Sequence, residues 1–199
     1  MAAVVIWMLG IALGLSIMIV TAAANMPLVH MAAAAIVSLV IAVLGVRENR
    51  ALRAAGASES AVAASTARHM AMVWIWGAIG LLVTYFFILT WKEWLTFFLV
   101  FAGVGVLCLI MTGALSRDAA AGREDPTMLK LGNYLTVGQL VGMVVTMIGL
   151  VVDGKMTRFA TIAGQRTGWQ DWAANNIFFF GAMALAAISL NALLSKPKS

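Results

Sequence analysis

Two histidines are the first candidates for chemistry in this sequence. Paired histidines inside a helical bundle can hold a haem iron or another transition metal. His30 and His69 each stand near the start of a different apolar run. If these runs are antiparallel membrane helices, the two side chains lie at opposite membrane surfaces, about 30 Å apart. We therefore expect each histidine to form local hydrogen bonds, and we predict no cofactor, no metal site and no catalytic residue.

The positions of the carboxylates likewise argue against a reactive site inside the membrane. All eight stand between apolar runs or at their ends: Glu48, Glu59, Glu93, Asp118, Glu124, Asp125, Asp153 and Asp171. Ionisable groups buried in a membrane usually mark ion pathways or proton relays. The sequence therefore argues against a proton-coupled pump that uses carboxylates at mid-membrane.

Small residues recur four positions apart within two apolar runs. This spacing lets the backbones of neighbouring membrane helices approach closely, so it predicts packing or partner contacts. The residues concerned are Gly10, Gly14, Gly138, Gly142 and Thr146.

Gln139 is a polar residue within one of these runs. A buried amide needs a hydrogen-bonding partner, so its helix should face protein rather than lipid. The partner is expected from Asn191, Ser38 or Thr84, or from another subunit. A permeation path lined by Gln139 is the alternative.

The segment from Asp153 to Trp172 is the most unusual loop. It carries Lys155, Arg158 and Arg166 on the side of the membrane that should be poor in positive charge. We predict that these three residues contact an acidic partner or an anionic ligand. A solvated loop lying along the lipid headgroups is the alternative.

The composition indicates a membrane protein. Hydrophobic residues make up 63% of the 199 residues and charged residues only 11%, whereas a soluble domain carries about 25% charged residues. The net charge is +5, but the basic residues lie between apolar runs. We therefore expect a lipid bilayer, and no nucleic acid, to be the partner of this positive charge.

Six charge-free runs are long enough to cross a bilayer. The predicted fold is an all-α polytopic membrane bundle that forms a single domain, with spans at about 3–20, 28–46, 71–90, 95–115, 135–152 and 173–194. Pro27 suits the first turn of the second helix. Asp125-Pro126 and, more weakly, Ser58-Glu59 predict helix starts that precede the fifth and third spans. No Lys or Arg precedes the first run, so we expect a retained span rather than a cleaved signal.

The basic residues predict the orientation. Nine of the 13 fall on one side of the six-span arrangement: Arg47, Arg50, Arg53, Arg68, Arg117, Arg123, Lys130, Lys196 and Lys198. By the positive-inside rule both termini are cytoplasmic, as expected for a bacterial inner membrane protein. Two interfacial tryptophan belts accord with this: Trp91, Trp94, Trp169 and Trp172 outside, and Trp7, Trp74 and Trp76 nearer the inside.

Three functions remain open. The first is a non-enzymatic membrane subunit or accessory protein that packs against other membrane subunits or against copies of itself. The second is a small homo-oligomeric permease or channel for uncharged or weakly charged solutes. The third is a membrane enzyme that uses His30 or His69 as an acid–base group at one interface.

Overall fold

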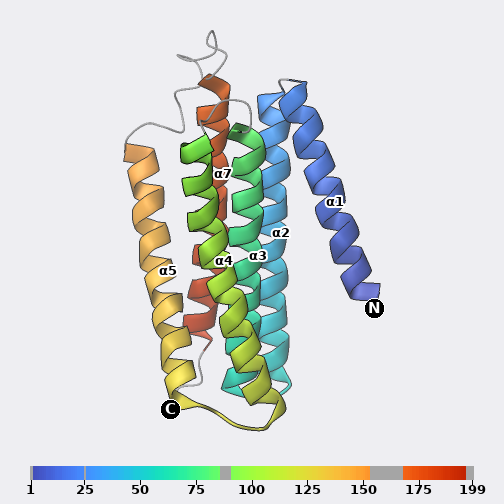
Figure 1. The fold of residues 1–199 in the computed structure, drawn as a ribbon. Coiled ribbons are helices and arrows are strands. Elements are labelled where there is room, and N and C mark those ends of the chain that lie inside the picture. The colour runs from blue at the N-terminus through green and yellow to red at the C-terminus, as the bar shows by residue number, and fades with distance from the viewer. Residues whose placement is uncertain (1, 25, 86–90, 153–167, 196–199) are drawn as a thin grey trace.

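The chain folds as a bundle of long helices (Figure 1). A computed structural model describes residues 2–24, 26–85, 91–152 and 168–195, and within these ranges there are six helices and no strand. The helices are α1 (Ala2–Ala23), α2 (Pro27–Ala54), α3 (Glu59–Tyr85), α4 (Trp91–Ala120), α5 (Pro126–Val152) and α7 (Gly168–Leu194). The predicted all-α bundle is confirmed.

Five of these helices are long and apolar enough to cross a membrane: α2, α3, α4, α5 and α7. A helix of 27 residues, such as α3, is about 40 Å long at 1.5 Å per residue and exceeds the hydrocarbon core. The first predicted span lies in α1, of which Ala12–Thr21 forms a shorter apolar stretch among the residues searched. The chain is therefore an integral membrane protein by length and composition.

Three helix starts follow from local sequence, as predicted. Asp125 Oδ1 accepts the backbone N–H of Thr127 at 2.8 Å, and Pro126 is the first residue of α5. Pro27 begins α2, where its missing N–H costs no intrahelical hydrogen bond. Ser58 Oγ accepts the backbone N–H of Ala61 at 3.3 Å and thereby caps α3.

Two predicted boundaries are wrong. Residues 91–94, which separate the third and fourth predicted spans, instead form the first turn of α4, because that helix begins at Trp91. The loop expected up to Trp172 ends sooner, because α7 begins at Gly168. The third predicted span lies in α3, which begins at Glu59 as the Ser58-Glu59 signal predicted.

Helix α3 is the centre of the bundle and contacts all five other described helices, most extensively α4. Helix α5 packs mainly against α7 and touches α3 and α4 only slightly. Helix α1 packs against α2 and α3 near its C-terminal end, and its ribbon diverges from theirs towards the N-terminus (Figure 1). Both α1 and α5 are therefore peripheral.

Trp74 and Trp76 belong to the packed interior rather than to an interfacial belt, so the predicted placement of these two residues is wrong. Their exposed fractions are 9% and 3%, and both lie mid-way along α3. Trp76 Nε1 donates to the carbonyl oxygen of Ala34 on α2 at 3.1 Å. This hydrogen bond allows an indole to be buried between helices.

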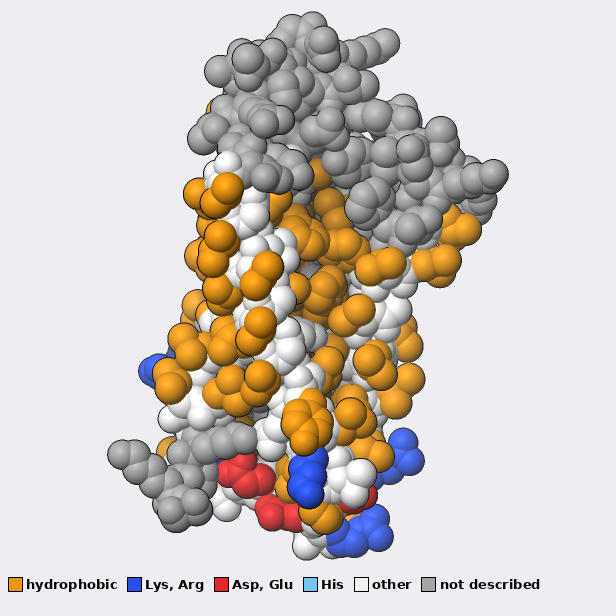
Figure 2. Space-filling model, turned by 90° about the vertical axis from the view of Figure 1, so that its left-hand side faces the viewer, with side chains coloured by type: hydrophobic (Ala, Val, Ile, Leu, Met, Phe, Trp, Pro, Cys, Tyr) orange, Lys and Arg blue, Asp and Glu red, His pale blue; other side chains and the backbone are white. Residues whose placement is uncertain are grey.

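Six arginines lie towards one end of the bundle: Arg47, Arg50, Arg53, Arg68, Arg117 and Arg123. We call this the arginine end, and the end that carries the α1–α2 turn the opposite end. Seen from the α5 side, the surface is mainly hydrophobic, and its charged side chains gather in the lower part (Figure 2). This asymmetry is the pattern on which the predicted orientation rests.

Candidate functional site: the α5 face and the polar interior

The amide of Gln139 lies at the boundary between α5 and α4. Its Nε2 donates to Sγ of Cys108 at 3.6 Å, and its exposed fraction is 7%. Its Oε1 is buried and has no hydrogen-bonding partner among the described residues. The sequence predicts a partner from Asn191, Ser38 or Thr84, or from another subunit. Within the described residues the amide instead contacts the Cys108 thiol. A sulfur atom is a weak acceptor, and the amide is thus only partly satisfied.

Three of the four glycines of α5 lie on the outer side of that helix. An added Cβ on Gly138, Gly142 or Gly149 would meet no atom within 4 Å. At 100° per residue these three positions fall within about 40° of one another. They therefore form a stripe on which no other described helix of this chain packs. The Thr146 hydroxyl donates to the carbonyl of Gly142 on its own helix at 2.8 Å, and the predicted packing of Thr146 against a partner stays a prediction.

The glycines of α1 have different surroundings. A Cβ on Gly14 would lie 2.8 Å from Cη2 of Trp76, so Gly14 permits the close approach of α1 and α3. Gly10 lies in α1, but the surroundings of its side-chain position are outside the described residues. Lys155, Arg158 and Arg166 also lie outside the described residues, so their predicted contacts stay predictions.

His30 joins three helices at the opposite end. It is completely buried; its Nδ1 lies 3.1 Å from the carbonyl oxygen of Met18, and its Nε2 lies 2.8 Å from Oγ1 of Thr84. A carbonyl oxygen only accepts hydrogen bonds, which places a proton on Nδ1. The Thr84 hydroxyl also lies 2.6 Å from the carbonyl oxygen of Gly80, so its single proton serves either that carbonyl or Nε2. His30 therefore connects α2 to α1 and α3.

His69 lies towards the arginine end, between α3 and α2. Its Nδ1 lies 2.8 Å from the carbonyl oxygen of Ser65, and its Nε2 lies 3.7 Å from a carboxylate oxygen of Glu48. The other carboxylate oxygen of Glu48 forms an ion pair with Arg68. Within the described residues, no group of three His, Cys, Asp or Glu side chains is placed to hold a metal ion.

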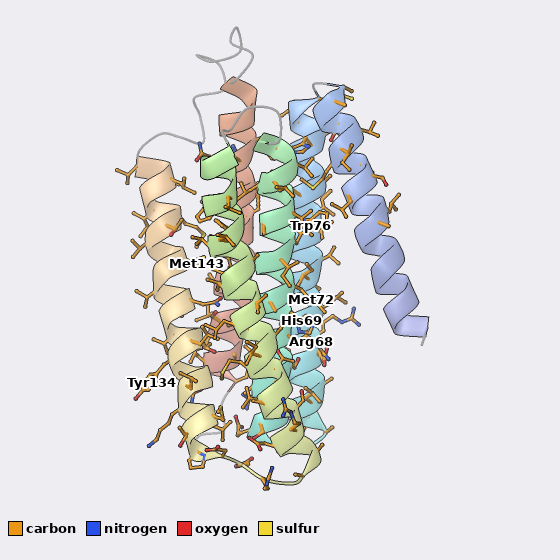
Figure 3. The ribbon with its side chains drawn as sticks, viewed as in Figure 1. Arg68, His69, Met72, Trp76, Tyr134 and Met143 are labelled. Carbon is orange, nitrogen blue, oxygen red and sulfur yellow. The ribbon has the colours of Figure 1, made fainter. Side chains whose placement is uncertain are left out.

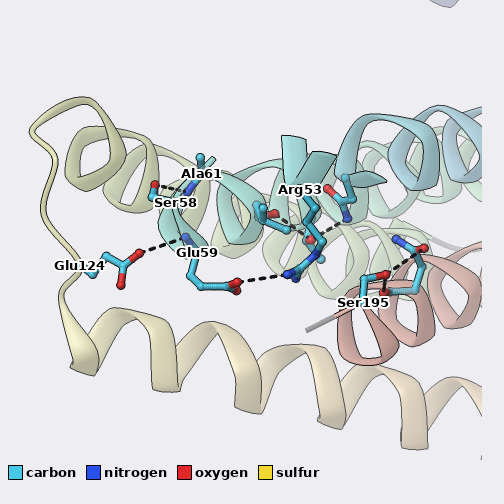
Figure 4. A network of polar contacts seen from close by, with 10 residues as sticks. Arg53, Ser58, Glu59, Ala61, Glu124 and Ser195 are labelled. Carbon is cyan, nitrogen blue, oxygen red and sulfur yellow. Dashed lines mark hydrogen bonds and ion pairs between the residues drawn. The ribbon is translucent and has the colours of Figure 1, made fainter. Parts of the chain in front are cut away.

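A polar crevice opens among α2, α3, α5 and α7 at the arginine end, with Met111 of α4 also in its lining. Arg53 Nη1 donates to Glu59 Oε1 at 3.1 Å, and the backbone N–H of Glu59 donates to Glu124 Oε1 at 3.1 Å (Figure 4). Thr66, which also lines the crevice, accepts a hydrogen bond from Asn49 Nδ2 at 2.9 Å. The space of about 30 Å³ suits about two water molecules.

Several buried polar atoms near this crevice have no hydrogen-bonding partner among the described residues. They are Arg53 Nε, Asn49 Oδ1 and, on the last turns of α7, Asn191 Nδ2. An unsatisfied buried donor or acceptor costs about 1 to 3 kcal/mol. Water or another polar ligand in the crevice is the simplest way to satisfy them.

A second, smaller crevice lies among α3, α4, α5 and α7. Phe101 stands between Trp74 and Phe178 with edge-to-face ring contacts at 5.2 and 5.3 Å. Met143 of α5 completes the lining of this crevice, and Figure 3 shows this side chain pointing from α5 towards the other helices. The interior is therefore polar at the arginine end and aromatic further towards the opposite end.

Comparisons with models of known protein families, with curated proteins and with solved structures give no match. The assignment of function therefore rests on the residues described above.

Proposed function

We propose that this chain is a non-enzymatic membrane subunit that packs against another membrane protein through the open face of α5. The supporting observation is the open space over the Gly138–Gly142–Gly149 stripe, where an added Cβ would meet no described atom within 4 Å. Only 11% of the apolar stretch of α5 is buried within the chain, against 56% for α3. Glycine in a helix is less favourable than alanine by about 1 kcal/mol per residue. Contact with lipid alone gives no compensation for three such positions, whereas the backbone of a partner helix does.

The proposal includes the cellular location. The membrane is the bacterial inner membrane, and the arginine end with both termini faces the cytoplasm. The excess of arginine at one end of the bundle supports this orientation, since cytoplasmic segments retain positive charge.

Gly142→Leu provides the test of the docking face. We expect this substitution to reduce the amount of co-purifying partner by at least about tenfold after gentle extraction from the native membrane, because a leucine side chain holds the partner helix away. Mass spectrometry of the extract identifies the lost chain as another protein or as a second copy of this one.

Gly103→Leu is the matched control. Gly103 of α4 is likewise exposed and has no atom within 4 Å of an added Cβ, so the same change of side chain occurs on a different lipid-facing helix. The proposal is overturned if the wild-type chain extracts alone. It is also overturned if both variants lose the partner to the same extent.

A small permease for uncharged or weakly charged solutes is the second candidate. The observation that favours it is the order of residues along α5: Thr136 lines the polar crevice, Met143 lines the aromatic one, and Gln139 stands between them in the helix. A solute that passed from one crevice to the other would have to pass the level of Gln139.

Gln139→Leu tests this second candidate in proteoliposomes, with glycerol and urea as solutes. We expect the flux to fall by about tenfold, because a leucine at this position removes the amide and narrows the polar path. Thr146→Val is the control, since the Thr146 hydroxyl is bonded within its own helix. Equal flux in the wild type and in Gln139→Leu, or no flux above that of empty liposomes, excludes the permease.

A further inference from the structure

An open groove lies over the outer side of α3 at the arginine end, between α2 and α4. It offers about 240 Å³ of space, far more than the crevice at Arg53. Its floor and one wall carry small side chains: Ala61, Ala64 and Ser65 from α3, and Ser116 and Ala119 from α4. The groove therefore arises because these positions are too small to fill the space between the helices.

Helix α1 covers this side of α3 only at the opposite end. There, Gly14 lies against Trp76, and Met18 lies 3.3 Å from where a Cβ on Gly80 would be. Towards the arginine end the ribbon of α1 diverges from α2 and α3 (Figure 1). The groove is thus the uncovered continuation of the surface on which α1 packs, and it opens towards the surrounding membrane.

Two opposite charges stand at the edge of the groove. Glu48 of α2 and Arg68 of α3 form an ion pair, and their side chains are 39% and 41% exposed. An arginine carries five N–H donors, so the contact with Glu48 leaves the guanidinium able to bind a phosphate oxygen. The carboxylate is likewise exposed enough to accept a hydrogen bond from an ammonium group.

An apolar path leads from the charged pair towards the middle of the membrane. Met72 stands one helical turn beyond Arg68 on the same side of α3, and Figure 3 shows both residues on the side of the bundle that faces α1. Leu44 stands one turn from Glu48 on α2 and is exposed. A molecule bound here would have its polar part at Glu48 and Arg68 and its apolar part along Met72.

We propose that this groove binds a phospholipid whose headgroup carries both a phosphate and a primary amine, as in phosphatidylethanolamine. The phosphate contacts Arg68, the ammonium group contacts Glu48, and an acyl chain follows Met72 between α1 and α3. A lipid with only negative charge would place that charge beside the Glu48 carboxylate. A quaternary ammonium group has no N–H with which to bind the carboxylate. The site is separate from the α5 face and does not depend on the proposed function.

The test is a titration of the purified full-length chain with three dioleoyl lipids, followed by native mass spectrometry. The lipids are phosphatidylethanolamine, phosphatidylcholine and phosphatidylglycerol, which share their acyl chains and differ in the headgroup. For the wild-type chain we expect a Kd for phosphatidylethanolamine about tenfold lower than for either of the others. This comparison requires no variant. Equal retention of the three lipids, or tighter binding of phosphatidylglycerol, overturns the proposal.

Variants then locate the site. Glu48→Gln and Arg68→Gln are each expected to reduce the preference for phosphatidylethanolamine to less than about twofold, because each removes one half of the complementary pair. Arg50→Gln is the control. Arg50 is an exposed residue of α2, the helix that carries Glu48, and it does not line the groove. A preference that persists in both groove variants places the lipid elsewhere and refutes the assignment.

Discussion

Replacing Gly45 with valine is expected to destabilise the isolated chain by about 2 kcal/mol, within the range of about 1 to 3 kcal/mol for overpacked interiors. A Cβ at this position would lie 2.8 Å from Cγ and 3.0 Å from Cβ of His69. These atoms lie close to the backbone of α3, and the ring is 3% exposed and bonded to the Ser65 carbonyl. The ring therefore has little freedom to move aside, and α2 and α3 must separate.

Gly138→Val is the matched control for this substitution. An added Cβ at Gly138 meets no atom within 4 Å, so we expect a change within about 0.5 kcal/mol, as is usual for surface substitutions. Unfolding of the two purified variants and the wild type in mixed micelles provides the measurement. Equal losses of stability in both variants would mean that the contact between Gly45 and His69 does not determine the distance between α2 and α3.

Replacing His30 with alanine is expected to destabilise the protein by about 3 kcal/mol. The substitution leaves a cavity at a completely buried position, and comparable large-to-small changes cost about 2 to 5 kcal/mol. It also removes the hydrogen bonds to the Met18 carbonyl and the Thr84 hydroxyl. Because Met18 belongs to α1, the effect should be greatest on the attachment of that helix.

Hydrogen–deuterium exchange followed by mass spectrometry measures this local effect. In His30→Ala we expect faster exchange over Ala12–Thr21 of α1, whereas α5 and α7 should keep the protection of the wild type. Ser16→Ala is the control, because Ser16 is exposed and its hydroxyl donates only to the carbonyl of Ala12 in its own helix, at 2.9 Å. Faster exchange throughout the bundle, without a specific change in α1, would contradict the role assigned to His30.

The features that the sequence predicted correctly are those with a local cause. The start of α5 follows from Asp125 and Pro126, because a capping carboxylate and a residue without an N–H act on the adjacent turn alone. The all-helical fold follows from the apolar runs, since a helix satisfies its backbone hydrogen bonds without water. Neither prediction requires knowledge of which helices are neighbours.

The rotation of each helix about its own axis was decided by the tertiary structure. The glycine spacing of α1 and α5 is alike in sequence, yet Gly14 lies against Trp76 whereas Gly138 and Gly142 face away from the chain. Hydrophobic periodicity normally indicates which side of a helix is buried, but a helix in lipid is apolar on all sides. The spacing therefore identified surfaces suited to close packing without identifying their partners.

The polar contacts also depended on the packing of distant segments. Gln139 donates to Cys108, which lies 31 positions away in the chain, and the groove at Glu48 and Arg68 is lined jointly by α2, α3 and α4. By itself the sequence determined that the chain forms membrane-spanning helices and where several of them begin, because caps, prolines and apolar length act locally. Tertiary structure decided which small and polar residues lie inside the bundle and which remain open to lipid or to a partner. The physical reason is that the surroundings of each residue depend on how helices distant in the chain pack together.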